Sequence, residues 1–444
     1  MHFARPAPRT LIAAIAAGVV LVGVGTAAVI AATGSSSGHQ KVGSVSQGDL
    51  PPATLAVAHL HGKKVPVGRQ LRLTVANGAF STVAVKQRGS GRLHGSFNPT
   101  HTRWRSASIV GPSSRLRASV TYVDLSHTTL HKTLTLRTRS AKAHVNALLS
   151  PGGNAVVGVG SPVVVSFDRP IPTSKQAAVE AGLSVTTKPK VVGAWHWMSD
   201  QVVHWRPPTY WKPGTKVTVS SYLQNVKIAR GEWGAVGHHS TSFKIGPSHI
   251  SIVNQATHQM NVYDDGKLIK TFPVSTGRSQ YPTMDGVHIA LAKSPVVEMD
   301  SATVGIPKGS PGYYDETVYW DVRISNGGEF VHAAPWSVGD QGHVNVSHGC
   351  VNLSTTNAQW FFHWALNGDV VDVYNGVRPP ESGDPGTADW NMSWKQWLAG
   401  DASPTAAAKA LHPGMPRLQE PGFGPPKHAT HKHATHKSSR SHSS

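Results

Sequence analysis

The chain is 444 residues long, which is too long for one ordinary domain and is close to the length of three. Hydrophobic residues make up 39% of it, and 44 glycines and 31 prolines help to break them into short runs rich in Val and Thr, as in β-rich domains. The net charge of +19 is unevenly distributed, so its location decides which partners it indicates.

Most of the positive charge lies in residues 51–150, where fifteen Lys or Arg face a single acid, Asp124, for a net charge of +14. Residues 151–400 have eighteen basic residues against nineteen acids, or −1, and the last 44 have six against two, or +4. A basic region of this kind suits an anionic polymer or surface. In the cytosol nucleic acid would be the expected partner, so the N-terminus has to settle the compartment.

Arg5 and Arg9 precede an uncharged run from Thr10 to Thr33. As a helix this run can cross a hydrocarbon core of about 30 Å, with the N-terminus in the cytoplasm. A cleaved signal peptide is the alternative, but its apolar region is usually only about 7–15 residues long. We therefore predict that residues 1–33 form a cytoplasmic segment and a single-pass anchor in the cell membrane. Everything after it would lie outside, which excludes nucleic acid and leaves anionic cell-wall polymers as partners.

Two β domains are predicted after a linker. Residues 34–52 are rich in Ser and Gly, as in flexible linkers. Alternating stretches separated by turn residues predict a small, basic β-sandwich over 53–148 and a second β domain over 149–248. The second domain contains four tryptophans, Trp195, Trp197, Trp205 and Trp211. Large aromatics form sandwich cores more often than sugar-stacking faces, so we predict that they are core.

A third domain is predicted over residues 249–376. Its segment 260–272 contains a strand, an Asp-Asp-Gly turn and a second strand, a strong hairpin pattern. Its one clear helix is predicted over Asn357–Asp369, with a glycine at its end. Residues 377–400 begin as a Pro/Gly-rich connector and end in a Trp-rich segment predicted to pack back as a helix. Residues 401–444 are predicted to be a disordered tail rich in His, Lys and Ser.

Cys350 is the only cysteine, so it has no partner for an intramolecular disulfide. Taken alone, it is either a buried, inert side chain or a working nucleophile. Thiol catalysis requires a base that forms the thiolate and donors for an oxyanion. Two candidate bases are near in sequence, His348 and, 18 residues upstream in a strand-like context, His332.

The residues around the cysteine add hydrogen-bonding groups. Gly349 permits a tight turn whose amides could face a developing oxyanion. Ser347 and Asn352 are close enough in sequence to reach the same turn. The pattern therefore favours a thiol nucleophile over an inert side chain.

Two other interpretations remain. His343, His348 and Cys350, with His332 or His363, could form a zinc site, but the paired ligand spacing of structural zinc sites is absent. The cysteine could also be structural, among histidines that only satisfy local hydrogen bonds. For His343 and His363 this simpler interpretation is favoured.

The motif S-H-G-C-V-N, preceded by F-V-H at this interval, resembles the catalytic signature of the L,D-transpeptidases, the YkuD-like family. The resemblance extends to VSTGRSQYPTMDGVH, MDSATVGIP, GYYDETV, NAQWFF, GDVVDV and DWNMSWKQW, in that order, and is closest to the mycobacterial-type members. It is strong from about 250 to 400 and weaker before that. It implies a mainly β protein with two immunoglobulin-like domains, a YkuD-like catalytic domain with one short helix, and a Trp-rich C-terminal subdomain.

The resemblance also implies an activity and its residues. Members attack a peptidoglycan tetrapeptide stem before its terminal D-Ala, form an acyl-enzyme on Cys, and pass the acyl group to a second stem, which makes a 3→3 cross-link. The implied catalytic residues are Cys350 as nucleophile, His332 as base and acid, Gly349 with Cys350 as oxyanion donors, and His348 and Ser347 as shapers of the turn. The implied substrate-binding residues are Tyr314, Gly327, Gly328, Asn352, Met299 and Trp336.

One position departs from the family pattern, because Ala333 stands where close relatives often have Ser after the catalytic His. Ala serves if this position orients His332 through its backbone carbonyl, and activity is in doubt if a hydroxyl is required. No metal or organic cofactor is expected, because a thiolate and an imidazole supply nucleophile and proton shuttle together.

The expected partners are donor and acceptor stems, the anionic wall polymers and the membrane, with carbapenem-type β-lactams as inhibitors. An L,D-carboxypeptidase that uses water as acceptor, or a non-catalytic wall-binding protein, are the alternative functions.

Overall fold

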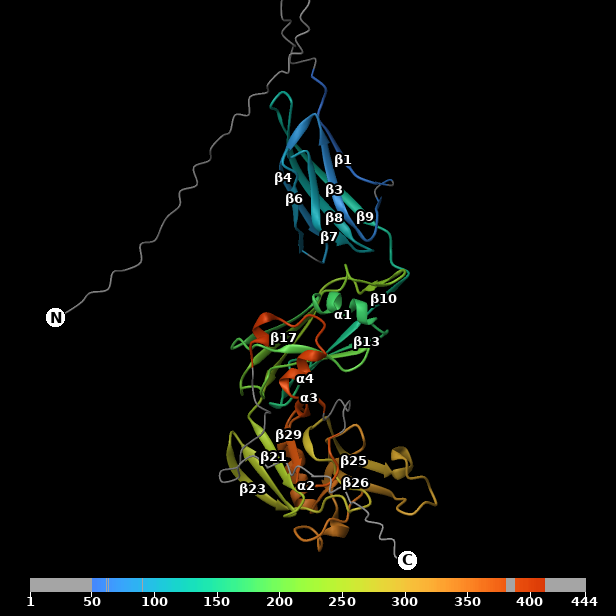
Figure 1. The fold of residues 1–444 in the computed structure, drawn as a ribbon, viewed down its shortest axis with the longest axis vertical. Helices are drawn as coiled ribbons and strands as arrows, with labels where there is room; N and C mark the ends of the chain where they lie inside the picture. Colours follow the sequence, from blue (N-terminus) through green and yellow to red (C-terminus); the bar gives the residue numbers. More distant parts are fainter. Residues whose placement is uncertain (1–49, 61, 63, 90, 381–387, 412–444) are drawn as a thin grey trace, which may run out of the picture. The chain divides into compact units, whose positions relative to one another are not determined.

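The computed structural model describes residues 50–60, 62, 64–89, 91–380 and 388–411 (Figure 1). The predicted anchor, nearly all of the predicted linker and the tail from residue 412 lie outside the described residues. Within the described part, no helix is both long enough and apolar enough to span a bilayer. The membrane anchor therefore stays a prediction.

The first domain is the predicted β-sandwich. Its two sheets have the strand orders β1-β3-β7-β6 and β2-β9-β8-β4-β5. Buried Leu71, Leu73 and Trp104 from one sheet meet Val85 and Leu116 from the other, and the residues between them point outward, as the alternation predicts. The strands are β1 (Thr54–Val57), β2 (Lys64–Val65), β3 (Arg69–Ala76), β4 (Gly78–Gln87), β5 (Gly91–Leu93), β6 (Gly95–Phe97), β7 (Arg103–Val110), β8 (Arg115–Asp124) and β9 (Thr129–Thr138).

The second domain is also a sandwich, with sheets β11-β13-β16-β15 and β12-β20-β17-β14 and a small sheet β10-β19-β18. Trp195, Trp205 and Trp211 are buried in its core and Trp197 packs against them, which confirms the core prediction. One helix, α1 (Thr173–Glu180), was not predicted. The strands are β10 (Ala143–Val145), β11 (Ala147–Ser150), β12 (Val156–Val157), β13 (Val163–Phe167), β14 (Leu183–Lys188), β15 (Ala194–Trp197), β16 (Val202–Arg206), β17 (Lys216–Ser221), β18 (Lys227–Ala229), β19 (Glu232–Gly234) and β20 (His239–Ile245).

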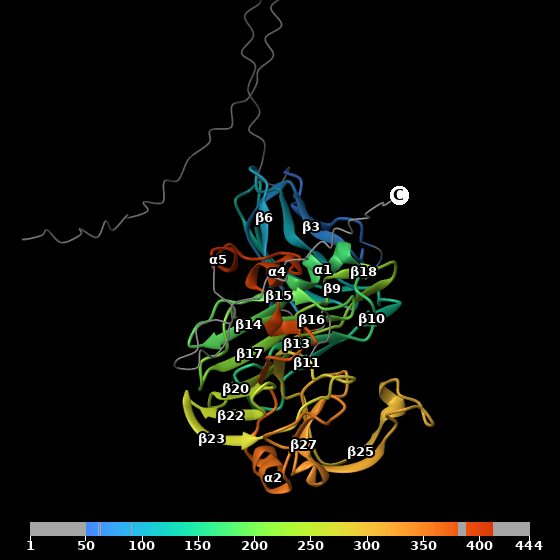
Figure 2. The same cartoon turned by 60° about the horizontal axis from the view of Figure 1, so that its bottom comes forward.

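The third domain has two sheets, β23-β22-β21-β29-β24 and β25-β26-β27-β28, with α2 packed in the apolar core between them (Figures 1 and 2). The predicted hairpin is β22 and β23, and its turn places Asp265 and Gly266 at positive φ. The elements are β21 (His249–Asn254), β22 (Gln259–Asp264), β23 (Lys267–Pro273), β24 (Gly286–Ile289), β25 (Ala292–Asp300), η2 (Ser301–Val304), β26 (Asp315–Arg323), β27 (Phe330–Ala333), η3 (Pro335–Ser337), β28 (Val351–Leu353), α2 (Thr355–Trp364) and β29 (Val370–Tyr374).

The predicted bounds of α2 were wrong at both ends. The helix begins earlier because the Ser354 side chain accepts from the Asn357 amide and caps it. It ends at Trp364 rather than near Asp369, because Lys293 Nζ donates to the Phe362 and Ala365 carbonyls at 2.5 and 2.6 Å. These bonds satisfy carbonyls that another helical turn would otherwise have used.

The predicted Trp-rich segment does pack back as helices, α3 (Ala388–Asn391) and α4 (Trp394–Ala399), with a Ser393–Gln396 capping box at the start of α4. It covers the second domain: Trp397 Nε1 donates to the Ala194 carbonyl at 3.0 Å, and Trp390 Nε1 to the Gly160 carbonyl at 2.7 Å. The guanidinium of Arg206, 1% exposed, lies 4.3 to 5.4 Å from the ring centres of Trp390, Trp394 and Trp397.

The prediction that disorder begins at residue 401 was wrong for 401–411. Asp401 accepts from the Trp195 amide, and Ser403 donates to Glu180 at 2.6 Å. The short helix α5 (Ala406–Lys409) follows, and its Ala408 packs under Trp394. These contacts order eleven residues that composition alone assigned to the tail.

Candidate active site

The site is built on two parallel strands, β27 and β28. Val331 pairs with Val351 and His332 with Asn352, and both valines face the core under α2. Since side chains alternate along a strand, His332 and Cys350 lie on the opposite face, away from the helix. The sheet therefore places on one face, on neighbouring strands, the two residues that sequence reasoning paired across 18 positions.

The thiol of Cys350 is protonated at rest. The residue is 8% exposed, and its Sγ lies 3.9 Å from the Gly328 carbonyl, toward which the thiol hydrogen points. Burial is the main cause that raises the pKa of Cys350 to about 12, and the charges of Glu329 and Asp321 add to it. A hydrogen bond from the Phe330 backbone acts in the other direction.

His332 is held as a base. Its Nδ1 lies 2.9 Å from the Ala333 carbonyl, which can only accept, so the proton is on Nδ1 and Nε2 carries the lone pair. Burial lowers the pKa of His332 to about 4, so the ring is neutral at ordinary pH. The group at position 333 that contacts the ring is the backbone carbonyl, which is the first of the two alternatives stated for Ala333.

The turn Ser347–Cys350 is closed by its own hydrogen bonds. Ser347 Oγ donates to the Cys350 carbonyl at 2.6 Å and accepts from the Gly349 amide at 3.0 Å, while Thr283 Oγ1 donates to the Gly349 carbonyl at 2.8 Å. Gly349 has φ +124°, which favours glycine. Its amide would have to leave Ser347 to meet an oxyanion, so the predicted role of Gly349 requires a change of partner.

His348 supports the turn rather than carrying a charge. Its Nε2 accepts from Arg278 Nη2 at 2.5 Å, and the rings of Tyr281 and Tyr314 lie 4.8 and 4.7 Å away. Burial, and then the charge of Arg278, lower its pKa. Burial is the main cause that raises the pKa of Tyr314 to about 12, so its phenol keeps its proton.

The remaining predicted substrate-binding residues lie on several elements of this domain. Met299 is the next-to-last residue of β25 and is half-buried, and Trp336 is 55% exposed with its ring 6.2 Å from that of His332. Gly327 and Gly328 form the turn between β26 and β27. Asn352 of β28 pairs with His332 of β27, and its side chain donates to the Ser337 hydroxyl at 3.1 Å.

The described part of the structure does not bring the proposed zinc ligands together. His363 is on α2, on the far side of the sheet from Cys350, and His343 is exposed. Across the residues that the structure describes, no group of three His, Cys, Asp or Glu side chains could hold a metal ion. His363 has the local role that was predicted for it, since its Nδ1 bonds the Gln359 carbonyl within its own helix.

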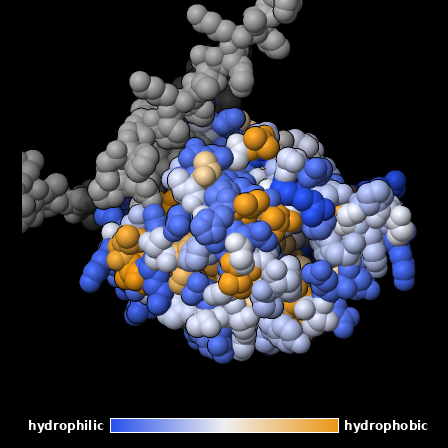
Figure 3. Space-filling model, turned by 90° about the horizontal axis from the view of Figure 1, so that it is seen from below, coloured by the Kyte–Doolittle hydropathy of each residue, from blue (hydrophilic) through white to orange (hydrophobic). Residues whose placement is uncertain are grey.

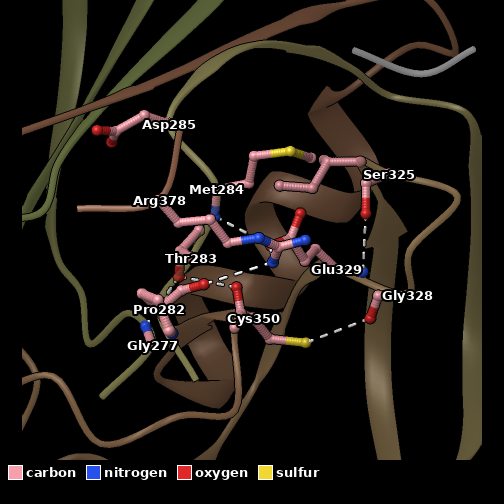
Figure 4. A network of polar contacts seen from close by, with 12 residues as sticks. Gly277, Pro282, Thr283, Met284, Asp285, Ser325, Gly328, Glu329, Cys350 and Arg378 are labelled. Atoms are coloured by element: carbon pink, nitrogen blue, oxygen red, sulfur yellow. Dashed lines mark hydrogen bonds and ion pairs between the residues drawn. The ribbon is translucent and has the colours of Figure 1, made fainter. Parts of the chain in front are cut away.

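Sequence reasoning missed an ion pair behind the catalytic turn (Figure 4). Glu329 Oε1 accepts from Arg378 Nη1 and from the Met284 amide, each at 3.0 Å, and the carboxylate lies near Gly349. Arg378 belongs to the segment that leaves the domain after β29, so this pair ties that segment to the base of the site. Its partners are 49 residues apart, and neither lies in a periodic pattern.

Asp321 was also missed. It lies in β26, at a point where the ladder to β27 shifts register opposite His332. Its neighbour Val322 packs in the core, so Asp321 faces the side of Cys350. The residue is 1% exposed, and among the described residues neither carboxylate oxygen has a hydrogen-bond partner. Burial raises the pKa of Asp321 to about 7.

Asp321→Asn should change how stability depends on pH. An unfolded Asp has a pKa of about 3.9, whereas the buried carboxyl titrates near 7, so the folded protein holds this proton more tightly and its stability falls as pH rises between these values. Asn cannot ionise, and the variant should gain roughly 1–3 kcal/mol over wild type between pH 5 and pH 8. Urea unfolding of wild type and of the variant at pH 5 and at pH 8 measures this gain. The cost of burying the Asn amide is the same at both pH values, so it cancels when the two stability differences are compared. A stability difference that is the same at both values would contradict the assignment.

The surface seen in Figure 3 is mainly hydrophilic, with hydrophobic residues in small, separate patches. Exposed large hydrophobic residues near the catalytic residues in sequence include Trp336, Val338 and Val344. A surface of this kind suits a polar ligand better than a broad apolar partner.

Two family models match this chain. One describes an L,D-transpeptidase catalytic domain and matches residues 248–373, and the other describes a bacterial Ig domain and matches residues 62–227. L,D-transpeptidase 2 of Mycobacterium tuberculosis is 35% identical over 377 residues, which cover 84% of this chain and 91% of that protein. L,D-transpeptidase 1 of the same species is 37% identical over 227 residues, or 51% of this chain and 84% of that protein.

Solved structures give the same neighbours. The L,D-transpeptidase LdtMt1 in complex with imipenem has 37% sequence identity and a TM-score of 0.46, and the match covers 52% of this chain and 99% of that one. L,D-transpeptidase 3 from M. tuberculosis in complex with a faropenem-derived adduct has 33% identity and a TM-score of 0.45, with 52% and 98% covered.

Proposed function

Because the chain belongs to the L,D-transpeptidase family, we propose that it cross-links peptidoglycan stem peptides through an acyl-enzyme on Cys350. The observation that carries the proposal is the tautomer of His332, whose Nδ1–H is bound by the Ala333 carbonyl, so that the basic Nε2 is left for the thiol. The product is a 3→3 link between two stems, with release of the terminal D-Ala of the donor.

The first half of the reaction starts from the neutral pair. Cys350 Sγ attacks the carbonyl carbon that precedes the terminal D-Ala, and its proton passes to His332 Nε2 as the S–C bond forms. Because burial raises the pKa of the thiol, transfer of its proton during the attack is favoured over a free thiolate formed beforehand. The imidazolium then gives this proton to the D-Ala nitrogen as the C–N bond breaks, which leaves a thioester.

The second half returns the enzyme to its starting state. The side-chain amine of a second stem attacks the thioester carbon, and His332 takes a proton from the amine as the C–N bond forms. The C–S bond breaks, and the imidazolium returns the proton to the sulfur. The backbone amide of Cys350, together with that of Gly349 once it leaves Ser347, would stabilise the oxyanion in both halves.

The same residues also serve an L,D-carboxypeptidase, in which water replaces the amine. Incubation of the purified protein with a disaccharide-tetrapeptide separates the functions by mass spectrometry of the products. A cross-linked dimer with released D-Ala is the expected result. A disaccharide-tripeptide alone would identify the carboxypeptidase, and unchanged substrate would indicate a wall-binding protein without activity.

The proposal extends to inhibitors and location. The solved relatives include a complex with imipenem and a faropenem-derived adduct, which supports acylation of Cys350 by carbapenem-type β-lactams. We also propose that residues 1–33 anchor the protein in the membrane. The basic domain would then contact the anionic polymers of the wall.

A further inference from the structure

The first β-sandwich has an arginine-lined groove on one face. Three adjoining hollows of about 360 to 420 Å³ follow one another along β1, β3 and β7. The first hollow shares His59, Pro66 and Arg69 with the second, and the second shares Ala58 and Arg72 with the third. Because neighbouring hollows share lining residues, the three lie in one row along this part of the domain.

The groove is lined by basic side chains. Lys64, Arg69 and Arg139 line the first hollow, and Arg72, Arg103 and Arg105 line the third; all six are exposed. None of the hollows has a carboxylate among its described lining residues. Thr74, Ser96 and Asn98 add polar groups to the third hollow.

The charges are placed in a way that costs stability. Arg72 of β3 and Arg105 of β7 are directly opposed across the antiparallel ladder, and like charges in this position repel. The one acid of residues 51–150, Asp124, cannot compensate, because its carboxylate accepts from Ser126 and Thr128 at a turn of the other sheet. Within the described part of the chain, no ion pair involves the groove arginines.

We infer that this groove binds a linear polyanion of the cell wall, one with phosphate or carboxylate groups repeated along its length. Arginine binds both kinds of oxyanion through paired N–H groups, and an open path with several arginines suits a chain better than a single ion. The inference rests on the proposed function for its setting, since a peptidoglycan enzyme works among such polymers. The groove would hold the enzyme near its substrate and take no part in the chemistry.

Two variants that remove equal charge test the groove. Arg72→Gln with Arg105→Gln removes two charges from the groove, and Arg115→Gln with Arg117→Gln removes two exposed charges from the other sheet. Binding of the purified protein to inorganic polyphosphate and to polygalacturonate is measured over a series of salt concentrations. The groove variant should bind about 10- to 100-fold more weakly than wild type, and the slope of log K against log salt concentration should be smaller in magnitude by about 1.5. The affinity of the control variant should change less than about threefold.

The two polyanions distinguish a phosphate from a carboxylate ligand by which one binds more tightly. Equal losses in the two variants would overturn the groove, since binding would then follow net charge. Tighter binding to a single-stranded oligonucleotide of equal charge than to both polyanions would overturn the assignment to a wall polymer. Cooperative thermal unfolding with a midpoint no lower than that of wild type shows that the variants are folded. The assay does not use catalysis, so its outcome is independent of whether the enzyme forms cross-links.

Discussion

Replacing Cys350 by alanine is expected to abolish cross-link formation and to leave the fold intact. Cys350 is the only thiol in the chain, so the alanine variant has no second cysteine that could replace it as nucleophile. Loss of the nucleophile should reduce the rate by at least about 10⁴, to the background of the assay. Dimer formation from disaccharide-tetrapeptide measures the rate, and circular dichroism checks the fold.

A second readout makes this result specific. Incubation with a carbapenem should increase the mass of the wild-type protein by one acyl group and leave Cys350→Ala unchanged, because the adduct forms on the sulfur. Wild-type-like cross-linking by the alanine variant, or an adduct at another residue, would place the nucleophile elsewhere.

His332→Ala should have the next largest effect, a loss of about 10²–10⁴ in the rate of cross-linking. The imidazole takes the thiol proton through Nε2, and burial keeps the thiol protonated when no base is present. His343→Ala is the matched control, since His343 is exposed, and it should change the rate less than about twofold. Initial rates of dimer formation for the three proteins give the comparison.

The pH dependence of thiol alkylation tests the same pair. Burial raises the pKa of Cys350 to about 12, so iodoacetamide should react slowly at pH 7 and its rate should still rise with pH above 9. Burial lowers the pKa of His332 to about 4, so the base stays neutral, and the enzyme active, down to about pH 5. A thiol that titrates near its ordinary pKa of about 8.5, with the same profile in His332→Ala, would contradict the pairing.

The sequence predicted the parts of this protein that depend on local pattern. Alternation located the strands of both sandwiches and of the hairpin, and the S-H-G-C motif with its upstream histidine predicted a nucleophile and a base that the structure places on one face of the same sheet. The sequence also identified Ala333 as a departure from the family pattern, but it could not show which atom at this position contacts His332. The contact is made by the backbone carbonyl, which is present whatever the side chain is.

The rest depends on register and on contacts between distant segments. Asp321 is on the same side of the sheet as Cys350 because its neighbour Val322 packs in the core, and this follows only once the pairing of β26 with β27, and of β27 with β28, is known. Glu329 and Arg378 meet across 49 residues through a segment that runs out of the domain. The end of α2 was misplaced for the same reason, since Lys293 of β25 binds its last carbonyls.

The tryptophan helices that cover the second sandwich have a consequence for the order of folding. Ala194 and Trp397 are joined by a hydrogen bond across 203 residues. At a synthesis rate of about 5–20 residues per second, β15 leaves the ribosome roughly 10–40 s before its cover exists. During that time the Arg206 guanidinium lacks the three rings that it packs against. The second sandwich therefore reaches its final packing only after the whole catalytic domain and the tryptophan helices that follow it have been made.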